Sequence, residues 1–207
     1  MAPPLRLDLR GRDLESLPPL PADLEELDIG GNPRLCRLPA SLASQTRLRV
    51  LFASGCGFEE LPAVLGRLPS LRMVAFRGQA GGGLRRILPD ALPPSLEWLI
   101  LTENKLASLP AAIGGCARLR KLMLAGNELT ELPVELARCR RLELLRVSAN
   151  RLAALPRWLS ALPRLAWLQN GVPRRDAQPS YLWESLLRTG MTCGFRLELL
   201  ADAASRS

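Results

Sequence analysis

The sequence contains no histidine among its 207 residues. Without imidazole, no Ser-His-Asp or Cys-His catalytic arrangement and no histidine-containing zinc site can form. The five cysteines are scattered and include no CxxC pair, which indicates reduced thiols and not a disulfide framework. We therefore expect no catalytic residue, no metal and no cofactor in this chain.

Long hydrophobic runs are also lacking. No apolar stretch approaches the roughly 20 residues that a membrane-spanning helix needs. The first residues, "MAPPLRLDLRGRDLES", contain no apolar stretch long enough for a signal peptide, and Asp8, Asp13 and Glu15 argue against an organelle presequence. With 47% hydrophobic and 23% charged residues, the chain can still bury a real core. These features predict a cytoplasmic globular protein without a transmembrane segment.

A repeat of 23 to 25 residues occupies most of the chain. One copy reads "LEWLILTENKLASLPAAIGGCAR", and the full copies share the pattern LxxLxLxxNxLxxLPxxLxxLxx. A degenerate unit, "LRLDLRGRDLESLP", precedes them, and "LAWLQNGVP" looks like a truncated last one. The six full copies begin at Leu24, Leu48, Leu71, Leu96, Leu119 and Leu142.

This pattern resembles the leucine-rich repeat family, specifically its intracellular class of about 23 residues with a Leu-Pro pair in each repeat. The resemblance covers roughly residues 5–173. Similar proteins include the plant Ras-group-related proteins and animal Ras-suppressor and scaffold proteins. The resemblance implies a role in organising small GTPases, kinases or phosphatases.

Each repeat has the features of one coil of a solenoid. The LxL triplet has the period of a short strand, so its leucines, such as Leu99 and Leu101, should point inward. After the Leu-Pro pair the chain should return as short helical or 3-10 pieces, because proline suits the first helical position and would interrupt a longer helix. A single coil does not bury its leucines alone, so the coils must stack. We predict an α/β repeat solenoid, a leucine-rich repeat horseshoe, with a parallel sheet on its concave face and helical segments on its convex face.

The repeats should form one domain over residues 1–173, with about seven or eight units, the first and last degenerate. Residues 174–207 should form a C-terminal helical cap or tail, because "PSYLWESLLRTG" reads as a helix with an apolar stripe. A polar column follows the strands, where side-chain amides can satisfy buried backbone groups. The column holds Asn32, Asn104, Asn127 and Asn150, with Arg12, Cys56 and Gln79 in the less regular units.

The residues that flank the inward leucines should lie on the concave surface, and from the third to the seventh unit they are largely apolar. The fold does not require this, and tryptophan and methionine are enriched where interfaces bind most strongly. We therefore predict a contiguous surface that binds a partner protein. An alternative is that the C-terminal 30 residues cover this surface, or that its aromatic residues only stack along the sheet. The predicted partner-binding residues are Val50, Phe52, Met73, Trp98, Ile100, Lys121, Met123, Leu144, Arg146 and Trp167.

Three other features were considered as sites. The glycine-rich "GQAGGGLRR" lacks the Gly-Lys-Ser/Thr ending of a phosphate-binding loop and is expected to be a surface insertion. Cys116 and Cys139 occupy equivalent repeat positions and should be packed core thiols. Arginines flank the leading leucines and should line a basic edge, either as solvated charges or as an anion-binding surface. These arginines are Arg47, Arg49, Arg72, Arg118, Arg120, Arg141 and Arg164.

The predicted function is a non-catalytic interaction module that binds a folded protein through its concave surface, and a signalling scaffold is one form that such a module takes. A homodimer through the same surface is a further possibility. One alternative is the repeat portion of a larger signalling enzyme such as a kinase, although this chain has no VAIK-like lysine, HRD or DFG. Another is binding of an anionic polymer or membrane through the arginine edge, where affinity should fall steeply with salt. Nucleic acid is not the expected partner, because Asp8, Glu26, Asp28 and Glu103 also fall on the concave side.

Overall fold

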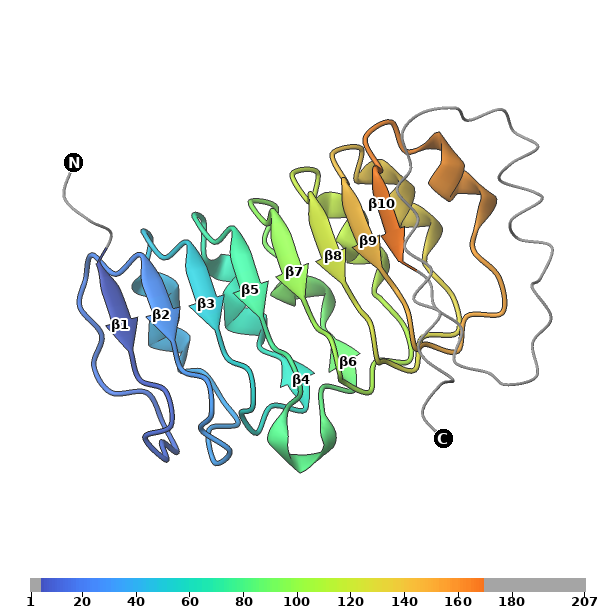
Figure 1. The fold of residues 1–207 in the computed structure, drawn as a ribbon. Helices are drawn as coiled ribbons and strands as arrows, with labels where there is room; N and C mark the ends of the chain where they lie inside the picture. Colours follow the sequence, from blue (N-terminus) through green and yellow to red (C-terminus); the bar gives the residue numbers. More distant parts are fainter. Residues whose placement is uncertain (1–4, 170–207) are drawn as a thin grey trace, which may run out of the picture.

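Residues 5–169, the part of the chain that the computed structural model describes, form one solenoid of stacked coils (Figure 1). Three-residue strands from successive coils form a parallel sheet of eight strands in the order β1-β2-β3-β5-β7-β8-β9-β10. The predicted repeat solenoid with a parallel sheet is confirmed. The predicted cap over residues 174–207 lies outside the described residues. The strands are β1 (Arg6–Asp8), β2 (Glu26–Asp28), β3 (Val50–Phe52), β5 (Met73–Ala75), β7 (Trp98–Ile100), β8 (Lys121–Met123), β9 (Leu144–Arg146) and β10 (Trp167–Gln169).

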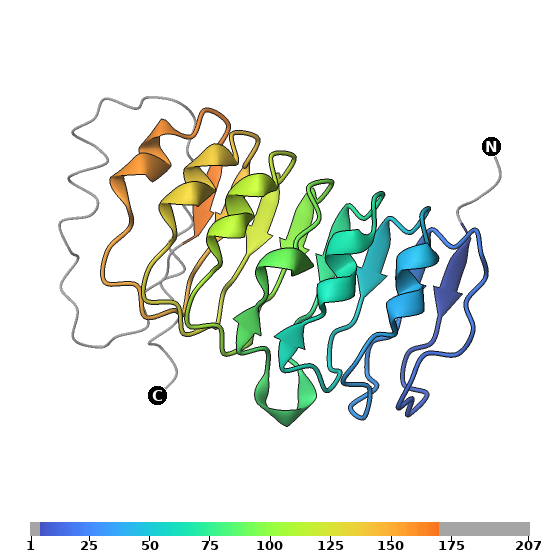
Figure 2. The same ribbon diagram turned by 180° about the vertical axis from the view of Figure 1, so that it is seen from behind.

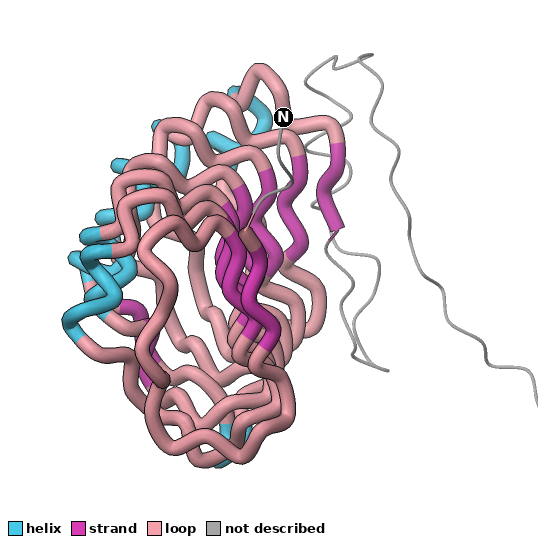
Figure 3. The backbone as a smooth tube through the Cα atoms, turned by 90° about the vertical axis from the view of Figure 1, so that its left-hand side faces the viewer, coloured by secondary structure: helices cyan, strands magenta, loops and turns pink. Residues whose placement is uncertain are grey.

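Short 3-10 helices line the side of the solenoid opposite the sheet (Figures 2 and 3), except η3, which lies at one edge of the solenoid. Five of them follow a proline, whose carbonyl accepts the first helical hydrogen bond, as Pro39 O does from Leu42 N at 3.0 Å. We predicted proline at the first helical position, but in these five it lies one residue earlier, in extended backbone, where a cap residue turns the chain into the helix. The helices are η1 (Ala40–Ser44), η2 (Ala63–Arg67), η3 (Ala80–Gly82), η4 (Pro89–Ala91), η5 (Ala111–Gly115), η6 (Val134–Arg138) and η7 (Arg157–Ala161).

The core is a stack of leucine columns between the sheet and the helices. The middle residue of each strand from β2 to β9 is at most 1% exposed, as Leu99 is in β7. Phe58 and Phe76 fill the space between two coils, with ring centroids 5.1 Å apart in an edge-to-face arrangement. Cys116 and Cys139 are fully buried, which confirms them as core thiols, and their burial raises their pKa values to about 12 and about 11.

The predicted polar column forms a hydrogen-bonded ladder between coils. The Asn127 amide nitrogen donates to the carbonyls of Leu101 at 2.8 Å and Leu124 at 2.9 Å, and its oxygen accepts from Leu106 N at 3.1 Å. Asn32, Asn104 and Asn150 make equivalent contacts. In the less regular units, Cys56 Sγ donates to Ile29 O at 3.1 Å, and Gln79 donates to Ala53 O at 2.8 Å. Each of these side chains satisfies a buried backbone group of its own or the adjacent coil.

The glycine-rich segment is a surface insertion only at its tip. It forms a bulge at one edge of the solenoid (Figure 1), and Gly81, Gly82 and Gly83 have positive φ angles. Both ends are anchored, since Gln79 and Leu84 are buried. The chain then forms a two-stranded parallel sheet that the sequence analysis did not predict, in which β6 (Arg86–Ile87) pairs with β4 (Glu60–Leu61).

A second column, one residue before the asparagine ladder, has left-handed backbone in each unit in which residues 5–169 include it. Its φ angles lie between 52° and 70°, and glycine occupies most of these positions because it has no Cβ atom. Glu103 and Ala149 occupy two of them, with φ angles of 57° and 53°. The coil geometry therefore imposes this conformation whichever residue is present.

Candidate interaction surface on the parallel sheet

The ten residues predicted to bind a partner lie in six neighbouring strands, from β3 to β10. Side chains alternate along a strand, so the residues on either side of each buried middle residue turn to the open side of the sheet. Nine of the ten are half-buried and Arg146 is exposed. We call this set the strand face, and it consists of Val50, Phe52, Met73, Trp98, Ile100, Lys121, Met123, Leu144, Arg146 and Trp167.

Parallel pairing places the apolar members of the strand face side by side. Trp98 pairs in register with Met73 on one side and with Lys121 on the other. In the second column, Ala75 separates Phe52 from Ile100. Ala75 is only 5% exposed, so the residues of this column pair in an unbroken register but do not project equally far from the sheet.

Lys121 lies directly against the largest side chain at the centre of the strand face. Its ammonium group is 3.8 Å from the centroid of the Trp98 ring, within the range of a cation–π interaction. The charge of Lys121 therefore lies over the face of the Trp98 ring on the open side of the sheet.

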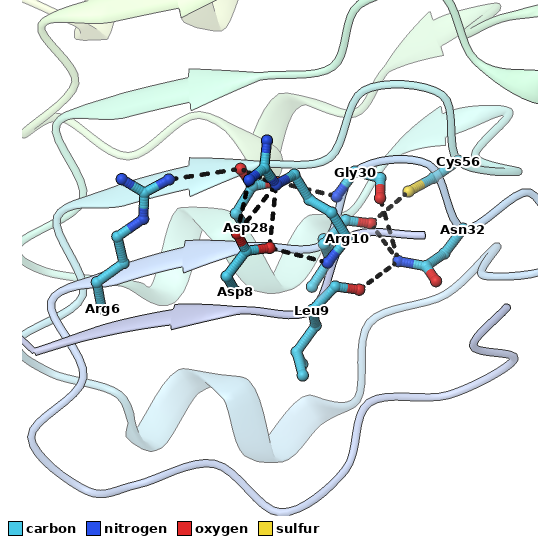
Figure 4. Close-up of polar contacts among 9 residues, drawn as sticks. Arg6, Asp8, Leu9, Arg10, Asp28, Gly30, Asn32 and Cys56 are labelled. Carbon is cyan, nitrogen blue, oxygen red and sulfur yellow. Dashed lines mark hydrogen bonds and ion pairs between the residues drawn. The ribbon is translucent and has the colours of Figure 1, made fainter. Parts of the chain in front are cut away.

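The N-terminal end of the same sheet carries an ion-pair cluster (Figure 4). Asp28 is 7% exposed, accepts a hydrogen bond from Gly30 N at 3.1 Å, and lies 3.4 Å from Arg10 and 3.9 Å from Arg6. Asp8 pairs with Arg10 at 2.7 Å. The hydrogen bond from Arg10 lowers the pKa of Asp8 to about 2, so the Asp8 carboxylate is ionised at neutral pH.

The sequence analysis did not identify this cluster as a site. The sequence does contain a signal for this cluster. Asp8 and Asp28 occupy the strand position that is apolar in the next units, and Arg10 follows Asp8 by two residues. The cluster adjoins a groove of about 850 Å³ at the first coils of the sheet. The groove is lined by Asp8, Arg10, Gly11, Arg12, Asp28, Gly30, Gly31, Phe52 and Ser54.

Comparison with known proteins agrees with this architecture. A family model described as "Leucine rich repeat" matches residues 94–152. Podocan of Mus musculus is 34% identical over 109 residues, which cover 51% of this chain and 17% of podocan. The chain is a leucine-rich repeat protein. It spans much less than two thirds of the length of this relative, so the similarity concerns the repeats and not the whole of podocan.

The arginines along the leucine-rich repeats are partly neutralised by acidic residues of neighbouring coils. Four of the seven are paired: Arg47 with Asp23 at 3.1 Å, Arg49 with Glu25 at 3.1 Å, Arg72 with Glu97 at 3.7 Å, and Arg120 with Glu143 at 3.0 Å. Within residues 5–169, Arg118, Arg141 and Arg164 have no ion pair. The basic edge is therefore a ladder of exposed ion pairs with three free cations toward its C-terminal end.

No helix in the described leucine-rich repeats is long and apolar enough to cross a membrane.

Proposed function

We propose that the chain is a non-catalytic module whose strand face binds a folded protein. The observation that carries this proposal is the contrast between the ends of one sheet. β1 and β2 fill the outward positions with Arg6, Asp8, Glu26 and Asp28, whereas β3, β5 and β7 fill the same positions with apolar side chains only. The coils stack with either charged or apolar residues at these positions, so coil stacking does not require the apolar side chains of the strand face.

Burial of the apolar side chains of the strand face by a partner makes a favourable contribution to the free energy of binding. Removing a further 100 Å² of apolar surface from water contributes about 2.5 kcal/mol, and a single tryptophan has about 150–250 Å² to bury. Trp98 and Trp167 are both half-buried in the free chain, so each retains surface for a partner. Lys121, beside Trp98, and Arg146 on β9 supply polar groups among the apolar residues, and protein interfaces combine both kinds of group.

We further propose a signalling scaffold in the cytoplasm whose partner is a small GTPase, kinase or phosphatase. The resemblance to intracellular repeats supports the partner class. Free cysteines support a reducing compartment, since Cys36, Cys56, Cys116 and Cys139 are unpaired in the described part of the chain. The arginine edge favours anionic polymers less, because four of its seven cations already face carboxylates. The alternative of a larger signalling enzyme predicts a catalytic domain elsewhere in the gene product.

Site-specific photo-cross-linking tests the proposal. A benzoylphenylalanine in place of Phe52 or Trp98 is expected to form covalent adducts with a discrete protein in cells. The same group in place of Val134 is the matched control, because Val134 is 63% exposed and apolar but lies in η6 on the opposite side. Equal labelling from both sides, or none from the strand face, contradicts the proposal.

A further inference from the structure

Charge is segregated along the open side of the sheet. The first two strands carry three outward carboxylates, Asp8, Glu26 and Asp28, and one outward guanidinium, Arg6. Arg10 pairs with Asp8 and Asp28, whereas Glu26 has no ion pair within residues 5–169. The strands β8 and β9 carry Lys121 and Arg146, which also have no ion pair among the described residues. Between these ends the outward side chains of β3, β5 and β7 are all uncharged.

A surface with opposite charges at its two ends and an apolar middle is complementary to itself under two-fold rotation. In such an interface residue i contacts residue j, and residue j contacts residue i. A two-fold axis parallel to the strands and passing over β5 brings β2 of one copy against β8 of the other. Glu26 then faces Lys121 and Asp8 faces Arg146, each pair twice.

The same axis matches the apolar residues. It sets β3 against β7, so that Val50 faces Trp98 and Phe52 faces Ile100, and it places Met73 against Met73 of the second copy. Ala75, the smallest and most buried outward residue, also meets itself, which lets the two sheets approach closely. The bulky side chains of Phe52, Met73 and Trp98 lie on β5 or on the strands next to it, so they are close to the axis.

The available area is of the right order for such a contact. Seven strands at a spacing of ~4.8 Å extend about 30 Å, and the outward columns are about 15 Å wide, so the flat footprint is on the order of 450 Å² per copy. This flat footprint is about half of the roughly 800 Å² per partner of a standard interface, and protruding side chains add to the accessible area.

We propose that the occupant of the strand face is a second copy of this chain, in a two-fold dimer centred on β5. This inference rests on the proposed function that the strand face binds a folded protein, and it names a second copy, in place of a GTPase, kinase or phosphatase, as the protein bound at that surface. Burial of the apolar residues of the strand face supplies the free energy of association, and the pairs Glu26–Lys121 and Asp8–Arg146 fix the register between the two copies. A register shifted by one strand loses both pairs, and the one new pair that it allows, Asp28–Arg146, uses a carboxylate that Arg10 and Gly30 N already contact.

Charge exchange tests the register. The probe is the purified full chain, studied by sedimentation velocity over a wide concentration range, and a species of twice 22.7 kDa is expected. Glu26→Lys and Lys121→Glu each place like charges in contact twice per dimer, so each is expected to weaken the dimer about tenfold or more. Mixing the two variants restores a dimer, because the introduced lysine faces the introduced glutamate while Lys121 of one chain faces Glu26 of the other.

Glu131→Lys and Lys105→Glu are the matched controls, since they make the same charge changes at exposed residues away from the strand face. They should leave the dimer unchanged, and thermal unfolding of every variant should stay within a few degrees of the parent. A chain that is monomeric at all concentrations, or a mixture that does not restore the dimer, overturns the proposal.

The outcome also separates this inference from the proposed function. A monomeric chain whose Phe52 position still cross-links a different protein refutes the second copy as occupant but leaves the strand face as a binding surface. A dimer that Glu26→Lys and Lys121→Glu do not weaken has its interface elsewhere and refutes the inference. A monomeric chain without adducts at Phe52 or Trp98 refutes both.

Discussion

Lys121 and Trp98 sit side by side in register on neighbouring strands, with the lysine ammonium 3.8 Å from the centroid of the indole ring. One residue along the chain, Leu99 is completely buried. Of these adjacent residues of β7, Leu99 therefore packs in the core, whereas Trp98 lies on the open side of the sheet.

This difference predicts unequal effects on stability. Leu99→Ala should lower the free energy of unfolding by about 2–5 kcal/mol, because it opens a cavity in the core. Trp98→Ala removes a half-buried ring and a surface cation–π contact worth about 0.5–1 kcal/mol, so it should cost no more than about 1–2 kcal/mol. Urea unfolding followed by circular dichroism measures both. If Trp98→Ala unfolds the chain as readily as Leu99→Ala does, the ring belongs to the core and the strand face is misassigned.

The asparagine ladder should contribute strongly to coil stacking. Asn127→Ala leaves Leu106 N and the carbonyls of Leu101 and Leu124 without their side-chain partner, and each unpaired buried group costs about 1–3 kcal/mol. We expect a loss of about 3 kcal/mol or more in the free energy of unfolding. Thr130→Ala, an exposed polar substitution in the same coil, is the control and should change stability by less than about 0.5 kcal/mol. Equal losses for the two variants contradict the role of the ladder.

Ala149 lies in a left-handed position that glycine fills in most coils. A left-handed conformation costs a residue with a Cβ atom roughly 1–2 kcal/mol, so Ala149→Gly should raise the free energy of unfolding by about 1 kcal/mol after the added chain entropy is subtracted. Ala125→Gly is the matched control, because Ala125 does not have a positive φ angle. That control should lose about 0.5–1 kcal/mol. Thermal unfolding of the two variants should therefore shift in opposite directions, and a shift in the same direction would refute the interpretation.

The buried thiols predict a loss of stability at alkaline pH. In the folded chain burial raises the pKa values of Cys116 and Cys139 to about 12 and about 11, above the ordinary thiol value of 9.0. The stability from keeping these thiols protonated is fully present below pH 9 and is lost as the pH rises from 9 toward 11–12, because the unfolded chain ionises first. The Cys116→Ala, Cys139→Ala variant should lose less stability than the parent between pH 9 and 11. Parallel pH profiles for the two proteins would show that the thiols do not contribute.

Thiol reactivity gives an independent measurement of the same burial. In a Cys193→Ser background, a thiol reagent at pH 8 should modify Cys36 rapidly, because Cys36 is exposed. Cys56, Cys116 and Cys139 should react only on unfolding. Mass spectrometry after partial labelling identifies the modified residue. Rapid modification of Cys116 in the folded chain would show that the coils open locally.

Several features of the fold follow directly from the repeat pattern. The recurring leucines predicted the parallel sheet, and Asn32, Asn104, Asn127 and Asn150 were correctly placed in one hydrogen-bonded column. These predictions succeed because one repeat fixes the conformation of its own coil, and stacking repeats it. The buried ends of the glycine-rich segment and the β4–β6 pair were not predicted, because they depend on one irregular coil meeting its neighbours.

The sequence by itself determined the solenoid, the inward leucines and the identity of the residues that flank them, because strand alternation and a fixed repeat length need no information from distant parts of the chain. Only the tertiary structure decided which of these flanking residues meet one another. It put Lys121 over Trp98 and joined Asp8, Arg10 and Asp28 into one cluster, because these contacts depend on the register between coils and on side-chain conformation. It also paired Arg47, Arg49, Arg72 and Arg120 with carboxylates of the neighbouring coils, and so decided which cations of the basic edge stay free.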